Sequence, residues 1–217
     1  MIKPNNMLKF FQRSIAVPGN LLRIPITDVP VLSLIQPDMA NGPWIAGGAV
    51  IQWYRGRPVG RHDVDVFFRD EQQFNTVKNK LQTDMRDVFD FKSSPPANNC
   101  QLIFNSTNAE TYQWNGFNVQ LIKSRYYNSV NELLDRFDIT ACKVASDGRS
   151  WYTNHPLTEQ HIKDYVLDMD QIMPEMAVKR MFKYWIYGYQ PTVDLIERIQ
   201  KIPNLQNNFA NSTDYDS

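Results

Sequence analysis

The chain has 217 residues, of which 42% are hydrophobic and 21% are charged, and its formal net charge at pH 7 is zero. This balance is ordinary for a globular protein, and with no excess of positive charge any site for a polyanion must be a local patch. Two cysteines, Cys100 and Cys142, are too few for a disulfide framework or a zinc finger. No apolar run approaches the length of a membrane span, so we expect a cytoplasmic protein with no membrane partner.

The first two thirds of the chain predict alternating helices and strands. Apolar spacing and turn residues indicate helices at 29–36, 49–56, 70–85 and 129–137, and strands at 43–47, 63–69, 88–93, 100–106, 117–123 and 139–145. Thr27 or Asp28 is the expected N-cap of the first helix. Ser129, followed three residues later by Glu132, is a capping-box signature. The segments 93–99 and 107–116 are expected to be connections.

The last third predicts helices at 157–169, 174–189 and 192–202, with Pro174 in a first turn and Gly188 at a helix end. Alternating elements followed by helices favour an α/β (α+β) fold, a small mixed sheet flanked by helices with a C-terminal helical appendage. We expect a head over residues 1–152, a helical region over 153–203 packed on it, and a polar, disordered tail over 204–217.

Two aspartates stand one residue apart at the start of the strand "DVDVFF". In a strand, Asp63 and Asp65 point to the same face, where the two carboxylates repel each other unless a cation lies between them. Oxygen ligands of this kind suit Mg²⁺, which takes one or two carboxylates together with substrate phosphates. A solvated strand end with two harmless aspartates is the alternative.

Two glycines precede the aspartates, in "IAGGAVIQWY". Gly47 and Gly48 open a predicted helix, and glycine lets a phosphate approach the backbone closely; the alternative is a plain turn. A phosphate cradle beside a two-carboxylate metal site is the arrangement that nucleotidyl transfer requires.

These segments together resemble a known family. "GGAVIQWYRGRPVGRHDVDVFF", "RFDITACKVASDGR" and "PEMAVKRMFKYWIYGY" resemble, in this order, three motifs of the polymerase-β-like nucleotidyltransferases. The similarity is closest to the class II CCA-adding tRNA nucleotidyltransferases and bacterial poly(A) polymerases, and short phage-encoded chains are also of this type. The resemblance implies their fold and a metal-dependent transfer of NMP from an NTP, with Mg²⁺ or Mn²⁺ and release of pyrophosphate.

The resemblance also assigns roles to residues. Asp63, Asp65 and Asp138 are the implied catalytic carboxylates: the first two bind the metal, and Asp138 contacts the ribose or completes the metal site. The implied nucleotide contacts are Gly47, Gly48, Arg57, Arg61, Arg136, Arg180 and Lys183. For Arg57, Arg61 and Arg136 an ordinary solvated charge is an equal alternative. The aromatic residues near Arg180 and Lys183 are expected in the core.

The sequence also departs from the family pattern. Ile51 and Gln52 replace an Arg-Asp pair, Phe137 replaces an arginine, and Cys142 replaces an asparagine. The acidic base-reading motif and the tRNA-binding body are absent from the printed sequence. The closest family favours an RNA 3′ end, such as that of tRNA, as the acceptor; a protein side chain, a small molecule or a non-catalytic nucleotide-binding module are the alternatives.

Other chemistry-bearing residues receive no site role. His155 and His161 are six residues apart, which is not the spacing of a helical metal pair. Asp168 and Asp170 repeat the Asp-x-Asp pattern inside a predicted helix, where residues two positions apart do not face each other. We therefore expect a solvated helix end there.

Overall fold

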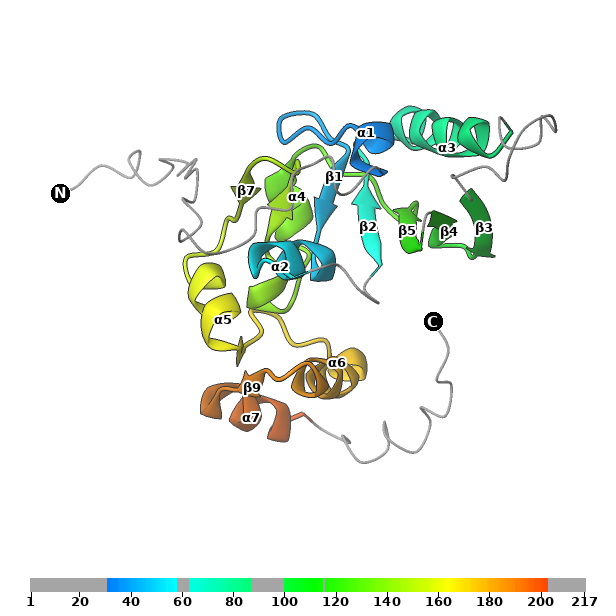
Figure 1. Cartoon of the computed structure of the whole chain (residues 1–217). Helices are drawn as coiled ribbons and strands as arrows, with labels where there is room; N and C mark the ends of the chain where they lie inside the picture. The colour runs from blue at the N-terminus through cyan, green and yellow to red at the C-terminus, as the bar shows by residue number, and fades with distance from the viewer. Residues whose placement is uncertain (1–30, 58–62, 87–99, 115, 203–217) are drawn as a thin grey trace.

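A computed structural model of the chain describes residues 31–57, 63–86, 100–114 and 116–202 (Figure 1). Several predictions lie outside the described residues, namely the Thr27 or Asp28 cap, the strand at 88–93, the tail at 204–217, and Arg61. Among the helices described here, none has the length and apolar character needed to cross a lipid bilayer.

A mixed sheet of seven strands, in the spatial order β3-β4-β5-β2-β1-β6-β7, is the framework of the fold. The strands are β1 (Trp44–Ala46), β2 (Val64–Phe67), β3 (Cys100–Asn105), β4 (Ala109–Trp114), β5 (Phe117–Ile122), β6 (Ala145–Ser146) and β7 (Trp151–Tyr152). β2 and β5 run parallel, and the other neighbours are antiparallel. The predicted α/β class, a mixed sheet with flanking helices, is confirmed, although the sheet is larger than expected.

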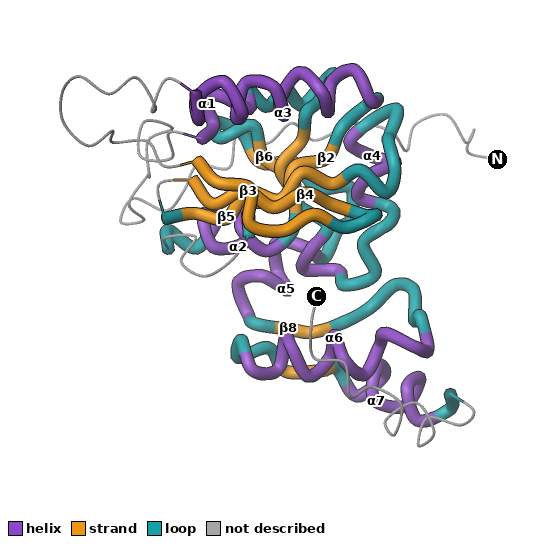
Figure 2. Tube along the Cα trace, turned by 90° about the vertical axis from the view of Figure 1, so that its right-hand side faces the viewer, coloured by secondary structure: helices purple, strands orange, loops and turns teal. Residues whose placement is uncertain are grey.

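Helices cover the sheet from both sides. Figures 1 and 2 show α1 (Val31–Ile35) and α3 (Glu71–Arg86) on one side of the sheet and α2 (Gly48–Tyr54) on the other. The spacing that predicted α3 is the reason for its packing, because Phe74, Val77 and Leu81 are all buried against the sheet. The short helix α4 (Val130–Leu134) begins at Ser129, whose hydroxyl accepts a hydrogen bond from Glu132 N, as the capping signature predicts.

The C-terminal region forms a further layer below α2 in Figure 1. It contains α5 (Thr158–Asp164), α6 (Pro174–Ile186) and α7 (Val193–Gln200), together with a two-stranded parallel sheet of β8 (Val166–Leu167) and β9 (Gln190–Pro191). Pro174 occupies the first turn of α6 as expected. The prediction that the aromatic residues of this helix belong to the core is correct for Tyr184 and wrong for Phe182 and Trp185, which are 46% and 52% exposed.

Three local predictions are wrong. The expected connection at 107–116 contains β4, which pairs along its whole length with β5; its β-prone Thr111, Tyr112 and Trp114 outweigh the flanking turn residues. The strand expected at 139–145 is a 3₁₀ turn, Thr140–Cys142, followed by the two-residue β6. The helix expected at 157–169 ends at Asp164, because Tyr165 takes a left-handed conformation (φ +56°) and the chain continues into β8.

Candidate active site

Strand β2 presents both aspartates to one side of the sheet. Val64 and Val66 are fully buried in the core, and the two-residue period of a strand therefore directs Asp65 to the opposite face. Asp63 precedes the first strand residue and continues the same period. Asp65 lies opposite Gln120 of the parallel strand β5. The same-face prediction for the two aspartates agrees with this arrangement, since both line one cavity.

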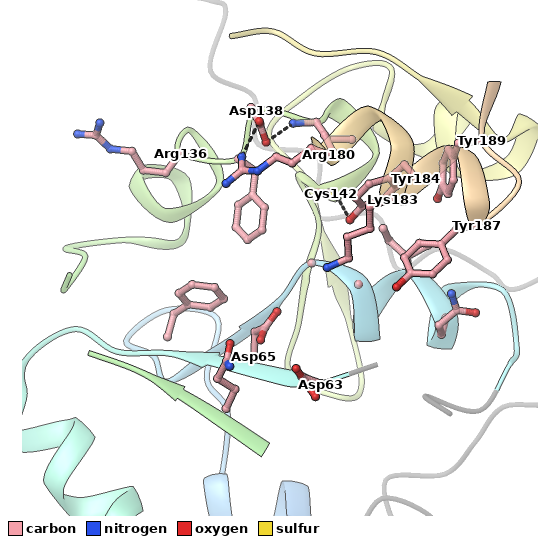
Figure 3. A pocket seen from close by; sticks show the side chains of 18 of the residues that line it. Asp63, Asp65, Arg136, Asp138, Cys142, Arg180, Lys183, Tyr184, Tyr187 and Tyr189 are labelled. Atoms are coloured by element: carbon pink, nitrogen blue, oxygen red, sulfur yellow. Dashed lines mark hydrogen bonds and ion pairs between the residues drawn. The ribbon is translucent and has the colours of Figure 1, made fainter. Parts of the chain in front are cut away.

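The cavity has a volume of about 460 Å³ and lies between the sheet and α6 (Figure 3). In Figure 3 Asp63 and Asp65 lie on one side of it, and Lys183 extends from α6 toward them. Its lining residues come from several separate parts of the chain: Gly47, Gly48, Ile51, Gln52, Asp63, Asp65, Phe67, Gln120, Tyr127, Arg136, Phe137, Asp138, Ile139, Cys142, Arg180, Lys183, Tyr184, Tyr187 and Tyr189. Segments far apart in the sequence thus converge on one site.

Asp65 is a carboxyl group whose pKa this environment shifts strongly. Burial, and after it the Asp63 carboxylate, raise its pKa from an ordinary 3.8 to about 7, against the opposing effect of Lys183. When the ionised form of a carboxyl group is destabilised in this way, a nearby positive charge stabilises it. This is the repulsion that the sequence predicted for a closely spaced pair, and it is the electrostatic condition that a bound cation would relieve.

Asp138 and Arg180 form an ion pair at the other side of the cavity. Arg180 Nη1 lies 2.5 Å from Asp138 Oδ2, and Asp138 Oδ1 accepts a hydrogen bond from Ile139 N at 2.9 Å. Asp138 is only 4% exposed, so the arginine compensates a charge that water hardly reaches. Among the described residues no group of three or more histidine, cysteine, aspartate or glutamate side chains is gathered for a metal ion.

Gly47 and Gly48 lie where β1 passes into α2. Gly47 has φ +81°, a conformation that L side chains rarely adopt. The Gly47 N–H donates a hydrogen bond to Val144 O at 3.2 Å, so this N–H is already used within the fold. Gly48 is the first residue of α2. A Cβ atom on Gly47 would lie 3.2 Å from Phe137 Cε1 and 3.8 Å from Asp65 Oδ2, which shows how closely the glycine, the ring and the carboxylate approach each other.

The positions that depart from the family pattern all line this cavity: Ile51, Gln52, Phe137 and Cys142. Cys142 Sγ lies 2.7 Å from the Tyr184 hydroxyl, and burial raises the pKa of the thiol to about 12. Cys142 is therefore a neutral thiol near pH 7. The substitutions change the chemistry of the site itself and leave the paired aspartates in place.

Only some of the remaining predicted nucleotide contacts line the cavity. Arg136 lines the cavity, but in Figure 3 its side chain extends away from Asp63 and Asp65. Arg57 is not among the lining residues, and its guanidinium lies 5.9 Å from the centre of the Tyr165 ring. Arg61 lies outside the described residues. Of the predicted cations, Arg136, Arg180 and Lys183 therefore line the cavity, and Lys183 is directed toward the two aspartates.

The expectation of a solvated helix end at Asp168 and Asp170 is wrong. Both residues follow β8 and make ion pairs: Asp168 Oδ1 lies 2.6 Å from Arg198 Nη2, and Asp170 Oδ2 lies 3.0 Å from the buried Lys143 Nζ. His155 Nε2 approaches the other oxygen of Asp170 at 3.2 Å. These contacts tie the segment that leads into α6 to the turn after Asp138, because Asp170 N also donates to Asp138 O.

Sequence reasoning missed several lining residues, and some of them carried a signal. Phe67 follows Asp65 by two positions, so the period that pairs the aspartates also places this ring on the cavity side. Tyr187 follows Lys183 by four positions and shares its helix face. Gln120, Tyr127 and Tyr189 reach the cavity through pairing and packing between distant segments, which the local pattern does not encode.

Comparison with known families identifies the chain. The family model described as "Gabija anti-defense 2 family protein", Gad2, matches residues 28–164, which is more than half of the chain. The chain belongs to the Gad2 family. The match includes Asp63, Asp65 and Asp138 and ends before α6. Among proteins with curated descriptions, none matches this sequence significantly.

Solved structures similar to this Gad2 protein include CCA-adding enzymes. The Bacillus stearothermophilus enzyme in complex with CTP is 15% identical, with a TM-score of 0.51 over 79% of this chain and 42% of that one. The Thermotoga maritima enzyme complexed with tRNA is 12% identical, with a TM-score of 0.51 over 85% and 42%. The predicted polymerase-β-like nucleotidyltransferase fold is confirmed, and the chain spans less than half the length of these neighbours.

Proposed function

We propose that this Gad2 protein binds a nucleoside triphosphate in the cavity and transfers its nucleotidyl group to an acceptor hydroxyl, with release of pyrophosphate. The observation that carries the proposal is the position of Asp63 and Asp65, on one wall of a cavity whose opposite wall holds Arg180 and Lys183. Paired carboxylates facing cations suit a ligand that carries both a metal ion and phosphates. The anti-defence role stated in the family name would depend on this transfer.

The two aspartates fit a divalent cation such as Mg²⁺ or Mn²⁺. Their side chains share a face of β2, and the pKa of Asp65 is raised to about 7 by burial and by Asp63, so positive charge is needed between them. Two carboxylates are a sufficient protein contribution when substrate phosphates complete the ligand set. The cation, when bound, supplies positive charge at the reacting phosphate.

The other residues would hold the nucleotide. Lys183 points toward the aspartates (Figure 3) and is placed to neutralise phosphate charge. The absence of a side chain at Gly47 and Gly48 keeps the backbone accessible where the cavity meets α2. Asp138, fixed by Arg180 and by Ile139 N, would accept a hydrogen bond from the ribose. In this proposal Asp138 is a ribose contact and Arg180 holds it in position.

An RNA 3′ end, such as that of tRNA, remains the acceptor predicted from the sequence. Lys183 at the cavity and Arg57 near Tyr165 support it as phosphate contacts. The charge of Arg180 is compensated by Asp138, so it contributes less to such a patch.

A second candidate is a non-catalytic nucleotide-binding module on the same fold. Phe137 favours it, because an apolar ring approaches Gly47 where the family motif carries an arginine. A module of this kind would bind NTP without forming a new phosphodiester or phosphoester bond.

The test is incubation of the full chain with each α-labelled NTP, Mg²⁺ or Mn²⁺, and either total RNA or lysate protein. Transfer predicts label in one class of polymer and none with Asp63→Ala or Asp65→Ala. Asp164→Ala, at the exposed end of α5, is the matched control and should behave as the wild type. NTP binding without any transferred label would favour the binding module, and absence of NTP binding would reject both functions.

A further inference from the structure

One wall of the cavity is made of aromatic rings. The Phe67 ring packs edge-to-face against Phe137, with ring centres 5.8 Å apart at 70°, and against Tyr127, with centres 6.1 Å apart at 72°. These residues come from β2, from the segment after α4 and from the segment before it. All three line the cavity.

The three rings differ in how much of their surface is covered. Tyr127 is 7% exposed and belongs to a core cluster with Trp44 and Leu133. Phe67 and Phe137 are only partly buried against that cluster. Part of these two apolar rings therefore borders the cavity, and a flat apolar ligand would remove that surface from water.

This aromatic wall adjoins the phosphate end of the proposed site. The Gly47 Cβ position lies within 4 Å of both the Phe137 ring and Asp65 Oδ2, so the ring and the carboxylate both lie next to this glycine. Phe137 is also the chain neighbour of Asp138, the proposed ribose contact. A nucleotide with its phosphates at Asp65 and its sugar at Asp138 has its base within reach of Phe67 and Phe137.

Two polar side chains near this wall already have partners. The Gln120 amide donates to Thr111 Oγ1 at 3.3 Å, and Asp138, the proposed ribose contact, is held by Arg180 and Ile139 N. Reading the edge of a base requires free donors and acceptors at fixed positions, whereas stacking on a ring tolerates every base because each one has a π-face.

We infer that Phe67 and Phe137 form a stacking subsite for the nucleobase, and that the site accepts all four NTPs with purines preferred. The inference rests on the proposed nucleotide binding and adds its specificity. Purines are favoured because their larger rings cover more aromatic surface. Phe137, which replaces an arginine of the family motif, then exchanges a charged contact for a stacking contact.

Calorimetric titration of the full chain with ATP, GTP, CTP, UTP and inorganic tripolyphosphate, each with Mg²⁺, tests the inference. We expect the four nucleotide Kd values to fall within about tenfold of each other, with ATP and GTP the tightest. Phe67→Leu and Phe137→Leu should each weaken ATP binding about tenfold and leave tripolyphosphate binding unchanged. Phe137→Tyr, which keeps the ring, should retain ATP binding.

Phe182→Leu is the matched control, because this exposed phenylalanine of α6 packs against Trp185 and does not line the cavity. Wild-type NTP binding that is unaffected by both leucine variants overturns the stacking subsite and leaves the proposed function standing. A strong preference for one base that survives in Phe137→Leu overturns it as well. Wild-type protein that binds no NTP rejects the proposed function itself.

Discussion

Arg180 of α6 holds Asp138 through an ion pair of 2.5 Å, and Asp138 is almost completely buried while Arg180 is about one third exposed. The pair joins the C-terminal helical region to the turn that follows α4. Asp170 N, which donates to Asp138 O, connects the same two regions through the backbone. α6 is thereby fixed above the cavity, with Lys183 directed at the aspartates (Figure 3).

Removing this arginine should destabilise the protein. Arg180→Gln leaves the buried Asp138 carboxylate without its cation, and we expect a loss of about 2 kcal/mol in the free energy of unfolding, below the value for a fully buried pair because Arg180 is partly exposed. Urea denaturation at pH 7 measures it. Lys183→Gln, a neighbouring cation directed into the cavity, is the control and should change stability by less than about 0.5 kcal/mol. Equal losses in the two variants would contradict a specific role for the ion pair.

Asp65 should make stability depend on pH in the absence of divalent cations. Its pKa is about 7 in the folded state against an ordinary 3.8. The unfolded chain therefore releases this proton first, and stability falls as the pH rises from about 4 to 7. Because Asp65 keeps some exposure to water, we expect this loss to be on the order of 1–2 kcal/mol, less than the full shift implies.

Asp65→Asn removes that contribution, so the variant should equal the wild type near pH 4 and exceed it above pH 7. Urea denaturation in EDTA over this range provides the comparison. Addition of Mg²⁺ at pH 8 should raise the stability of the wild type and leave Asp65→Asn unchanged. Parallel pH profiles for the two proteins would show that Asp65 is not perturbed in this way.

The paired aspartates illustrate what the local sequence predicts well. Their position depends on a strand period of two residues and on buried Val64 and Val66, both visible in the sequence. The partner of Asp138 is different, because Arg180 lies in α6, 42 residues further along the chain. The contact between Arg180 and Asp138 depends on how β8, Asp168 and Asp170 change the direction of the chain. The pattern of 157–169, in contrast, predicted one uninterrupted helix there. Local periodicity thus predicted the strand that carries the two aspartates, whereas long-range ion pairs determined what lies opposite it.

Gly47 should tolerate a side chain poorly, for two separable reasons. Gly47→Ala forces alanine to φ +81° and places its Cβ 3.2 Å from Phe137 Cε1. We expect a loss of about 1–3 kcal/mol in the free energy of unfolding and weaker binding of ATP with Mg²⁺.

Gly116→Ala is the control, because Gly116 has φ +84° with nothing within 4 Å of its Cβ position. The Gly116→Ala variant measures only the loss of stability caused by the positive φ, and it should leave ATP binding unchanged. If both variants bind ATP like the wild type, Gly47 is a structural turn and no part of the nucleotide site.

Binding of an RNA 3′ end should depend on salt through few contacts. The chain has zero net charge, and Arg180 is compensated by Asp138, so Lys183 and Arg57 are the described cations expected to contact phosphates. For single strands each contact contributes about −0.7 to the slope of log K against log salt concentration, and two contacts give a slope of roughly −1.4. Lys183→Gln should flatten that slope by about one contact's share.

Lys201→Gln, after the end of α7 and outside the cavity, is the control and should leave the slope unchanged. A salt series with a short tRNA-like 3′ end measures both. Normal NTP binding without detectable RNA binding at low salt would remove RNA as the acceptor and direct the search to protein or small-molecule hydroxyls.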